Sequence, residues 1–151
     1  MLKNIFERFA DKSDADIPQF SEDEARVAVA AILVSAARAD HNYDADEQDL
    51  VSRILAARYE LSDEDADALR QSGEETEQEA VDLFRFTHAI KTAIPHDDRT
   101  SILEALWSVA LADQDRDARE DALIRKLTDL LGLAPRDSAL ARQHIEERMG
   151  L

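Results

Sequence analysis

The sequence predicts a single all-α domain. Three observations lead to this fold class: apolar residues recur at helical spacing almost to the end of the chain, no run of alternating β-branched residues competes with them, and only 3 Gly and 3 Pro interrupt 151 residues. An apolar share of 44% is typical of a folded chain with its own core. We expect residues 1–151 to form one bundle of about seven to eight helices, with residues 1–19 as an N-terminal helix and linker and residues 20–151 as the bundle.

The N-terminal ten residues predict a first helix. Four apolar side chains share one face of it: Leu2, Ile5, Phe6 and Phe9. We expect this face to pack on the domain's own core, and docking on a membrane or a partner is the alternative. Residues 1–10 lack the continuous apolar stretch of a signal peptide, and residues 27–37 are too few to span a bilayer. The expectation is therefore a cytoplasmic protein with a buried helix over residues 27–37.

Capping motifs place the next two helices. Ser21 with Glu24 forms a capping box, which predicts a helix that begins after Ser21 and runs to about residue 38. Asp44 with Glu47 repeats this signature and predicts a helix that ends near Tyr59.

An acidic segment follows. Ser62 begins a short acidic helix, which we expect Gly73 to break or kink. Pro95 then terminates the following helix. Phe84 and Phe86 point to nearly opposite sides of that helix, so we expect one ring to be buried and the other to lie at a surface.

The C-terminal third is also helical. Trp107 lies among aliphatic residues at core spacing, so we expect its ring to be buried. Asp117 with Glu120 gives a third N-terminal signature. Gly132 is placed for a left-handed cap at the end of that helix, and Pro135 suits the first turn of the last one.

Two acidic segments, residues 39–47 and 112–120, repeat one pattern between apolar helices. Each places oxygen-bearing side chains at the same four positions, which are Asp40, Asn42, Asp44 and Glu47 in the first segment and Asp113, Asp115, Asp117 and Glu120 in the second. The repeat suggests two pseudo-equivalent helix, acidic loop, helix hairpins packed in one bundle.

These loops have the composition of a cation site. Alternate residues of a tight loop can turn toward a common centre, as oxygen ligands do around hard divalent cations. The loops are not EF-hands, because Ala45 stands where that motif has its turn glycine and Val51 replaces its last carboxylate. An all-oxygen ligand set suits calcium, magnesium or manganese, held in one shared site or in two.

Helix capping is the competing explanation of the same residues. Capping explains Asp44, and it explains Asp117 equally well, since both precede helices. It does not explain Asp40 and Asp113, which follow the C-terminal ends of the preceding helices, where a negative charge is unfavourable by about 0.3–1 kcal/mol. Cation binding, solvated capping loops and a basic partner peptide therefore all remain open.

The two Ala-Asp and Glu patterns, set between apolar helices of an acidic domain, resemble the tellurite-resistance TerB-like family over residues 20–133. The resemblance implies a small all-helical bundle with an acidic metal-binding surface, and a related domain occurs joined to DnaJ-type co-chaperones. It implies metal-binding roles for Asp40, Asp44 and Glu47 and for Asp113, Asp117 and Glu120. The family often has Gly directly after the Asp, where this chain has His41 and Gln114.

Composition excludes several classes of function. A formal charge of −16 argues against binding to phosphate backbones, and the absence of Cys excludes thiolate metal sites and a Cys nucleophile. The chain has no phosphate-binding loop, no dinucleotide fingerprint and no zinc-protease motif, so we expect no enzyme and no catalytic residues.

The prediction is a non-enzymatic, metal-binding protein of a stress or tellurite response. The alternative is a metal-independent adaptor that docks a protein partner through an acidic helix face or through the apolar side that carries Phe86. The sequence does not predict an oligomeric state.

Overall fold

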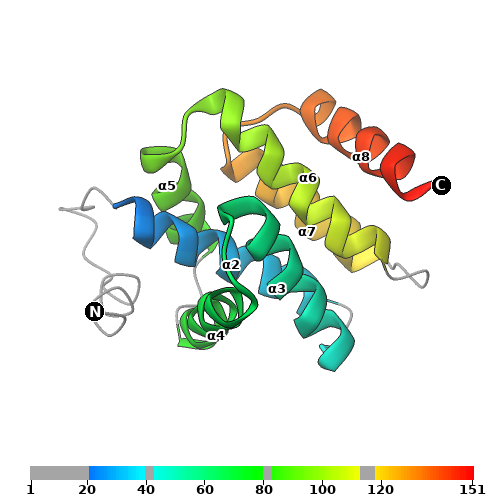
Figure 1. Cartoon of the computed structure of the whole chain (residues 1–151). Helices are drawn as coiled ribbons and strands as arrows, with labels where there is room; N and C mark the ends of the chain where they lie inside the picture. The colour runs from blue at the N-terminus through cyan, green and yellow to red at the C-terminus, as the bar shows by residue number, and fades with distance from the viewer. Residues whose placement is uncertain (1–20, 40–42, 80–82, 113–117) are drawn as a thin grey trace.

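All the secondary structure that the structure describes is helical, which confirms the predicted fold class. The computed structural model describes residues 21–39, 43–79, 83–112 and 118–151, with the backbone alone for residues 118–120 (Figure 1). The helices in these ranges are α2 (Glu22–Arg38), α3 (Ala45–Tyr59), α4 (Asp63–Glu79), α5 (Leu83–Ala93), α6 (His96–Ala112), α7 (Ala118–Leu130) and α8 (Pro135–Met149). The helix expected within residues 1–10 lies outside the described residues.

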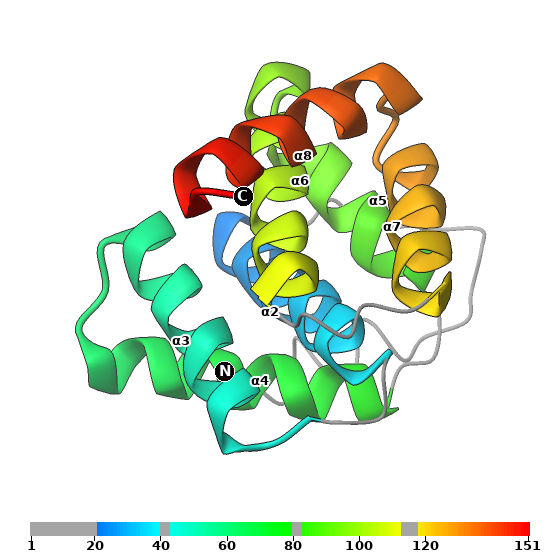
Figure 2. The same cartoon turned by 90° about the vertical axis from the view of Figure 1, so that its right-hand side faces the viewer.

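Helix α2 lies at the centre of the bundle. It packs against α3, α4, α5, α6 and α7, and the other helices surround it in both views (Figures 1 and 2). Every residue from 28 to 34 is fully buried. A helix that is apolar on all sides is stable only when it is covered on all sides, so the buried helix expected over residues 27–37 is confirmed. None of the described helices combines the length and the apolar character that a membrane span needs.

Helix α4 continues through Gly73, so the predicted break or kink at this residue is wrong. A Cβ atom at Gly73 would lie 2.6 Å from the Cβ of Ala30 and 2.8 Å from its backbone carbonyl carbon. Gly73 is therefore the point at which α4 crosses α2 in direct backbone contact. Gly costs a helix interior about 1 kcal/mol relative to Ala, and the close packing of two helices offsets that cost here.

The predicted caps are confirmed wherever the structure describes them. Ser21 Oγ accepts a hydrogen bond from the Glu24 backbone N–H at 3.2 Å, and Glu24 Oε1 accepts one from the Ser21 N–H at 3.1 Å. Gly132 has a φ of 73°, the left-handed conformation expected after a helix end. Pro135 is the first residue of α8. Local sequence signals therefore set these helix boundaries.

Helix α5 turns one of its two phenylalanines inward. Phe86 is buried, with 1% of its surface exposed, whereas Phe84 is 52% exposed and stacks on the ring of His88 at a centroid distance of 5.9 Å. The expectation of one buried and one exposed ring is confirmed, but the alternative that a partner docks on the apolar side that carries Phe86 is wrong, because Phe86 is buried. Phe86 shares the core-facing side of α5 with Ile90, and both are covered by the bundle.

Helix α8 closes the bundle by packing on α6 and α7. Trp107 on α6 is buried, as predicted, with 6% of its surface exposed. Its indole Nε1–H donates a hydrogen bond to Ser138 Oγ on α8 at 3.1 Å. The ring therefore joins these two helices by a polar contact as well as by apolar packing.

Candidate functional site

The structure describes the side chains of two of the eight predicted metal ligands, Asp44 and Glu47. The backbone of Glu120 lies in the first turn of α7, and its side chain is outside the described residues. The other five also lie outside them: Asp40, Asn42, Asp113, Asp115 and Asp117. The described part of the candidate site therefore consists of the helix ends that flank the two acidic segments.

Asp44 is the N-cap of α3. Its backbone is extended, and Oδ1 accepts a hydrogen bond from the Glu47 N–H at 3.0 Å. The predicted N-cap by Asp44 is thus confirmed. A carboxylate has about four lone-pair positions, and this bond occupies one of them. Capping by Asp44 and coordination of a cation by Asp44 are therefore chemically compatible.

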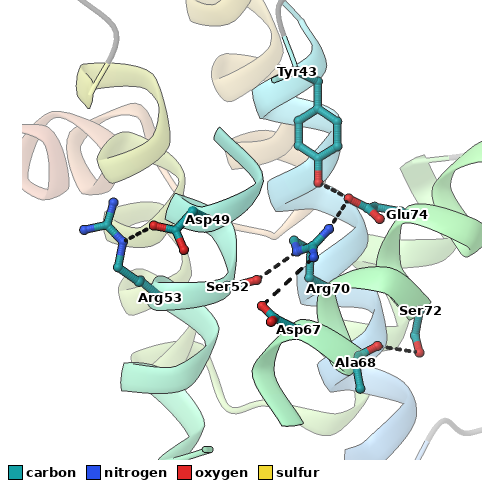
Figure 3. Close-up of polar contacts among 9 residues, drawn as sticks. All are labelled: Tyr43, Asp49, Ser52, Arg53, Asp67, Ala68, Arg70, Ser72 and Glu74. Atoms are coloured by element: carbon teal, nitrogen blue, oxygen red, sulfur yellow. Dashed lines mark hydrogen bonds and ion pairs between the residues drawn. The ribbon is translucent and has the colours of Figure 1, made fainter. Parts of the chain in front are cut away.

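Tyr43, directly before this cap, fixes the entry to α3 on the surface of α4. Its hydroxyl donates a hydrogen bond to Glu74 Oε2, and Arg70 Nη1 donates to the same carboxylate oxygen at 2.7 Å (Figure 3). Two donors on one carboxylate form a charge-assisted network in a half-buried place. The residue directly before the N-cap of α3 is thereby tied to a residue 31 positions later in the chain.

Arg70 joins α3 to α4 within the same network. Its Nε donates to Ser52 Oγ on α3 at 2.8 Å, and its Nη2 lies 4.0 Å from Asp67 Oδ1 (Figure 3). Burial lowers the pKa of the Arg70 guanidinium, but the hydrogen bond and the charge of Glu74 outweigh burial and leave the pKa above its ordinary value. The guanidinium stays charged and holds three side chains from two helices.

Arg38 reaches the same network from the end of α2. Its guanidinium carbon lies 5.0 Å from the centroid of the Tyr43 ring, and its Nη1 lies 3.4 Å from Glu77 Oε2 on α4. Burial raises the pKa of the Glu77 carboxyl, and the charge of Arg38 opposes that rise. Arg38 directly precedes the first acidic segment and Tyr43 lies within it, so the segment is tied to α4 at its start and again at Tyr43.

The environment of Tyr43 keeps its hydroxyl protonated. Burial is the largest cause, and the hydrogen bond to the Glu74 carboxylate adds to it, so the pKa of Tyr43 lies well above its ordinary value of 10. Arg70 opposes this rise and is outweighed. Tyr43 is therefore a hydrogen-bond donor at physiological pH and has no suitable acidity for proton transfer.

This network, which we call the Tyr43 anchor (Arg38, Tyr43, Arg70, Glu74 and Glu77), was missed by the sequence analysis. One signal of it was visible, since Arg70 and Glu74 have the i, i+4 spacing of a helical ion pair. The contacts with Tyr43 and with Arg38 join separate helices. They depend on how α2, α3 and α4 cross, which no local pattern specifies.

The helix ends around the two acidic segments gather at one end of the bundle. The C-terminal ends of α2 and α6 and the N-terminal ends of α3 and α7 lie toward the right-hand end in Figure 1, which faces the viewer in Figure 2. Both acidic segments therefore start and finish at the same end of the molecule.

Comparison with known protein families identifies the family to which the chain belongs. The family described as "Tellurite resistance protein TerB" matches residues 26–143, which is most of the chain. The chain belongs to the TerB family. No curated protein and no solved structure gives a significant match.

The TerB match spans both acidic segments and the Tyr43 anchor. Among the side chains described, no group of three or more His, Asp or Glu residues is placed to hold a metal ion. Asp44 and Glu47 are carboxylates one helical turn apart at the first segment, which is a donor set that fits a hard cation. The internal repeat and the metal-binding roles of the eight residues stay predictions for this TerB-family chain.

Proposed function

We propose that this TerB-family protein binds a divalent cation, calcium, magnesium or manganese, through its two acidic segments, and that it acts without catalysis in a stress or tellurite response. The observation that carries the proposal is the gathering of the four helix ends at one end of the bundle (Figures 1 and 2). Because the four helix ends lie at the same end, both acidic segments can supply cation ligands on one surface of the protein.

The helix ends also support the electrostatic argument for a cation. The C-cap of α2 is Ala39, and α6 ends at Ala112, so Asp40 and Asp113 come next in the chain after two helix C-termini. The partial negative charge of a helix C-terminus disfavours a carboxylate and favours a cation. A bound divalent cation would relieve the repulsion at both helix ends.

The experiment is thermal and chemical unfolding of the full chain with and without each metal. A ligand that binds only the folded state adds about 2.7 kcal/mol of stability at a hundredfold excess over its dissociation constant. We expect the double variant Asp40→Asn with Asp113→Asn to lose this gain and to keep, or slightly raise, the stability of the metal-free protein.

The matched control is Glu75→Gln with Glu147→Gln. These side chains are exposed on α4 and α8, and the pair removes the same formal charge as the Asp pair. The control should retain the gain in stability with metal. If both double variants lose the gain in stability equally, the metal binds because of the overall negative charge of the protein, and the proposed site is wrong.

A second candidate is a metal-independent adaptor that binds a basic protein. It is favoured by the outer side of α4, where Glu64, Asp65, Glu75 and Glu79 are exposed. Partners recovered equally with and without a chelator, and lost when Glu75 and Glu79 are replaced by Gln, would favour the adaptor. Partners recovered only in the presence of metal would favour cation binding.

A further inference from the structure

An open pocket lies between α7 and α8, and Trp107 of α6 forms part of its floor. Its volume is about 700 Å³, which is within the range of small-molecule sites. The floor is apolar and rigid, since Trp107, Ile124 and Leu133 are each at most 6% exposed. The hydrogen bond from Trp107 Nε1 to Ser138 Oγ fixes the orientation of the indole ring.

The rim of this pocket carries cations in a strongly acidic protein. Arg125 and Lys126 on α7 are exposed at the rim, and Arg142 enters from α8 with its guanidinium carbon 5.1 Å from the centroid of the Trp107 ring. Asp121 and Asp129 also line the pocket, one helical turn on either side of Arg125. Among the described residues that line the pocket, three cationic and two anionic side chains leave a positive balance, whereas the whole chain carries −16.

The cations at the rim are available to a ligand. Arg142 Nε lies 3.6 Å from Glu146 Oε1, and both side chains are more than a third exposed, so this ion pair adds little stability and competes weakly with a ligand. Arg125 and Lys126 have long side chains on an exposed helix face, and they can turn toward an anion without disturbing the core.

We propose that this α7–α8 pocket binds a small organic anion, with an aromatic or branched apolar group against Trp107 and a carboxylate or sulfonate at Arg125 and Lys126. The apolar floor supplies contact area, and the cations fix the orientation of the ligand. None of the described residues that line the pocket belongs to the acidic segments, so the proposal does not rest on metal binding.

Fluorescence titration of the full chain tests the proposal, because Trp107 is its single tryptophan and lies in the pocket. The probes are the aromatic sulfonate 8-anilinonaphthalene-1-sulfonate and its uncharged analogue N-phenyl-1-naphthylamine. We expect the sulfonate to bind one to one, to change Trp107 emission, and to bind about tenfold more tightly than the uncharged probe. Equal affinity of the two probes, or no change in Trp107 emission, would overturn the proposal.

Two variants and a control locate the binding. Arg125→Gln with Lys126→Gln should weaken the sulfonate about tenfold and leave the uncharged probe unchanged. Ala139→Leu, which fills the pocket with an apolar side chain, should weaken both probes. Arg136→Gln with Arg148→Gln removes the same charge from exposed positions of α8 and should change neither. If this control weakens the sulfonate as much as the pocket pair does, the proposal is wrong.

Discussion

Tyr43 shows how one side chain connects an acidic segment to the rest of the bundle. Its hydroxyl donates to Glu74, its ring contacts Arg38, and the cap residue Asp44 follows it directly. Because Tyr43 directly precedes this cap, its contacts fix the start of α3, where the predicted ligands Asp44 and Glu47 lie. The tyrosine is therefore a positioning residue for the proposed cation site.

The anchor contributes to stability in a measurable way. Tyr43→Phe removes the hydroxyl but keeps the ring, and we expect it to lower the free energy of unfolding by about 1–2 kcal/mol, because a hydrogen bond to a charged acceptor is lost. Denaturant unfolding provides the measurement.

Tyr59→Phe is the matched control. The buried Tyr59 hydroxyl has no hydrogen-bond partner among the described residues, and its ring contacts Arg26 much as the Tyr43 ring contacts Arg38. Removing it should change the free energy of unfolding by only a few tenths of a kcal/mol. If both variants lose the same stability, the hydrogen bond to Glu74 does not anchor the segment.

The raised pKa of Tyr43 predicts a pH dependence. Above about pH 10 a tyrosine of the unfolded chain loses its proton while Tyr43 of the folded protein keeps it, so the unfolded state binds fewer protons. The stability contributed by Tyr43 is complete below pH 10 and is lost as the pH rises through the higher pKa of the folded state.

At alkaline pH, the free energy of unfolding of the wild type should therefore fall more steeply with pH than that of Tyr43→Phe. Parallel curves for the two proteins would contradict the proposed environment of the hydroxyl.

At the scale of the elements, the crossing of α2 and α4 is the most constrained contact. α4 is acidic and carries few large apolar residues, and its buried side consists of Ala66, Ser72, Gly73 and Thr76. Small residues allow it to lie close to α2, which is itself rich in alanine. The stability of α4 thus depends on how closely the two backbones approach.

Gly73→Ala tests this crossing. On an exposed helix face this change would stabilise by up to about 1 kcal/mol, whereas here the new methyl group would overlap Ala30. We expect a loss of about 1–3 kcal/mol, measured as a lower Tm.

The double variant Gly73→Ala with Ala30→Gly should recover part of this loss, because it removes the contacted Cβ but leaves the backbone carbon at 2.8 Å. A Gly73→Ala protein as stable as the wild type would show that the helices do not cross so closely.

The elements also show which kinds of sequence signal are reliable. The Ser21 capping box, the Asp44 cap, Gly132 and Pro135 were all interpreted correctly, because each acts on its own helix end. The prediction for Gly73 was wrong because the residue that requires a glycine there, Ala30, lies on another helix. For the same reason, helical spacing indicated that the two phenylalanines of α5 point to nearly opposite sides, but it did not indicate which of them faces the core.

At the scale of the whole molecule, the fold and the family were predictable and the site only in part. Helical spacing and the scarcity of Gly and Pro are properties of the entire chain, and the TerB match over residues 26–143 agrees with them. The acidic segments were visible as a repeat. Their surroundings were not, since Arg38, Tyr43 and Glu74 meet through contacts between helices.

The charge of −16 is also distributed unevenly over the molecule. The predicted ligands contribute seven carboxylates to two short segments, while the described lining of the α7–α8 pocket has more cations than anions. A protein with such separated charges suits two ligands of opposite sign. Titrating the cation after saturation with the aromatic sulfonate should give the same cation affinity as before, because the described lining of the pocket includes none of the predicted metal ligands.

The proposed binding of a divalent cation by the two acidic segments can be measured on the whole protein. Calorimetric titration of the full chain with calcium, and then with manganese and magnesium, tests it most directly. We expect saturable heat with at least one metal. The double variant Asp40→Asn with Asp113→Asn should remove this heat, and the control Glu75→Gln with Glu147→Gln should retain it. The absence of both heat and thermal stabilisation at millimolar concentrations of all three metals would contradict the proposal.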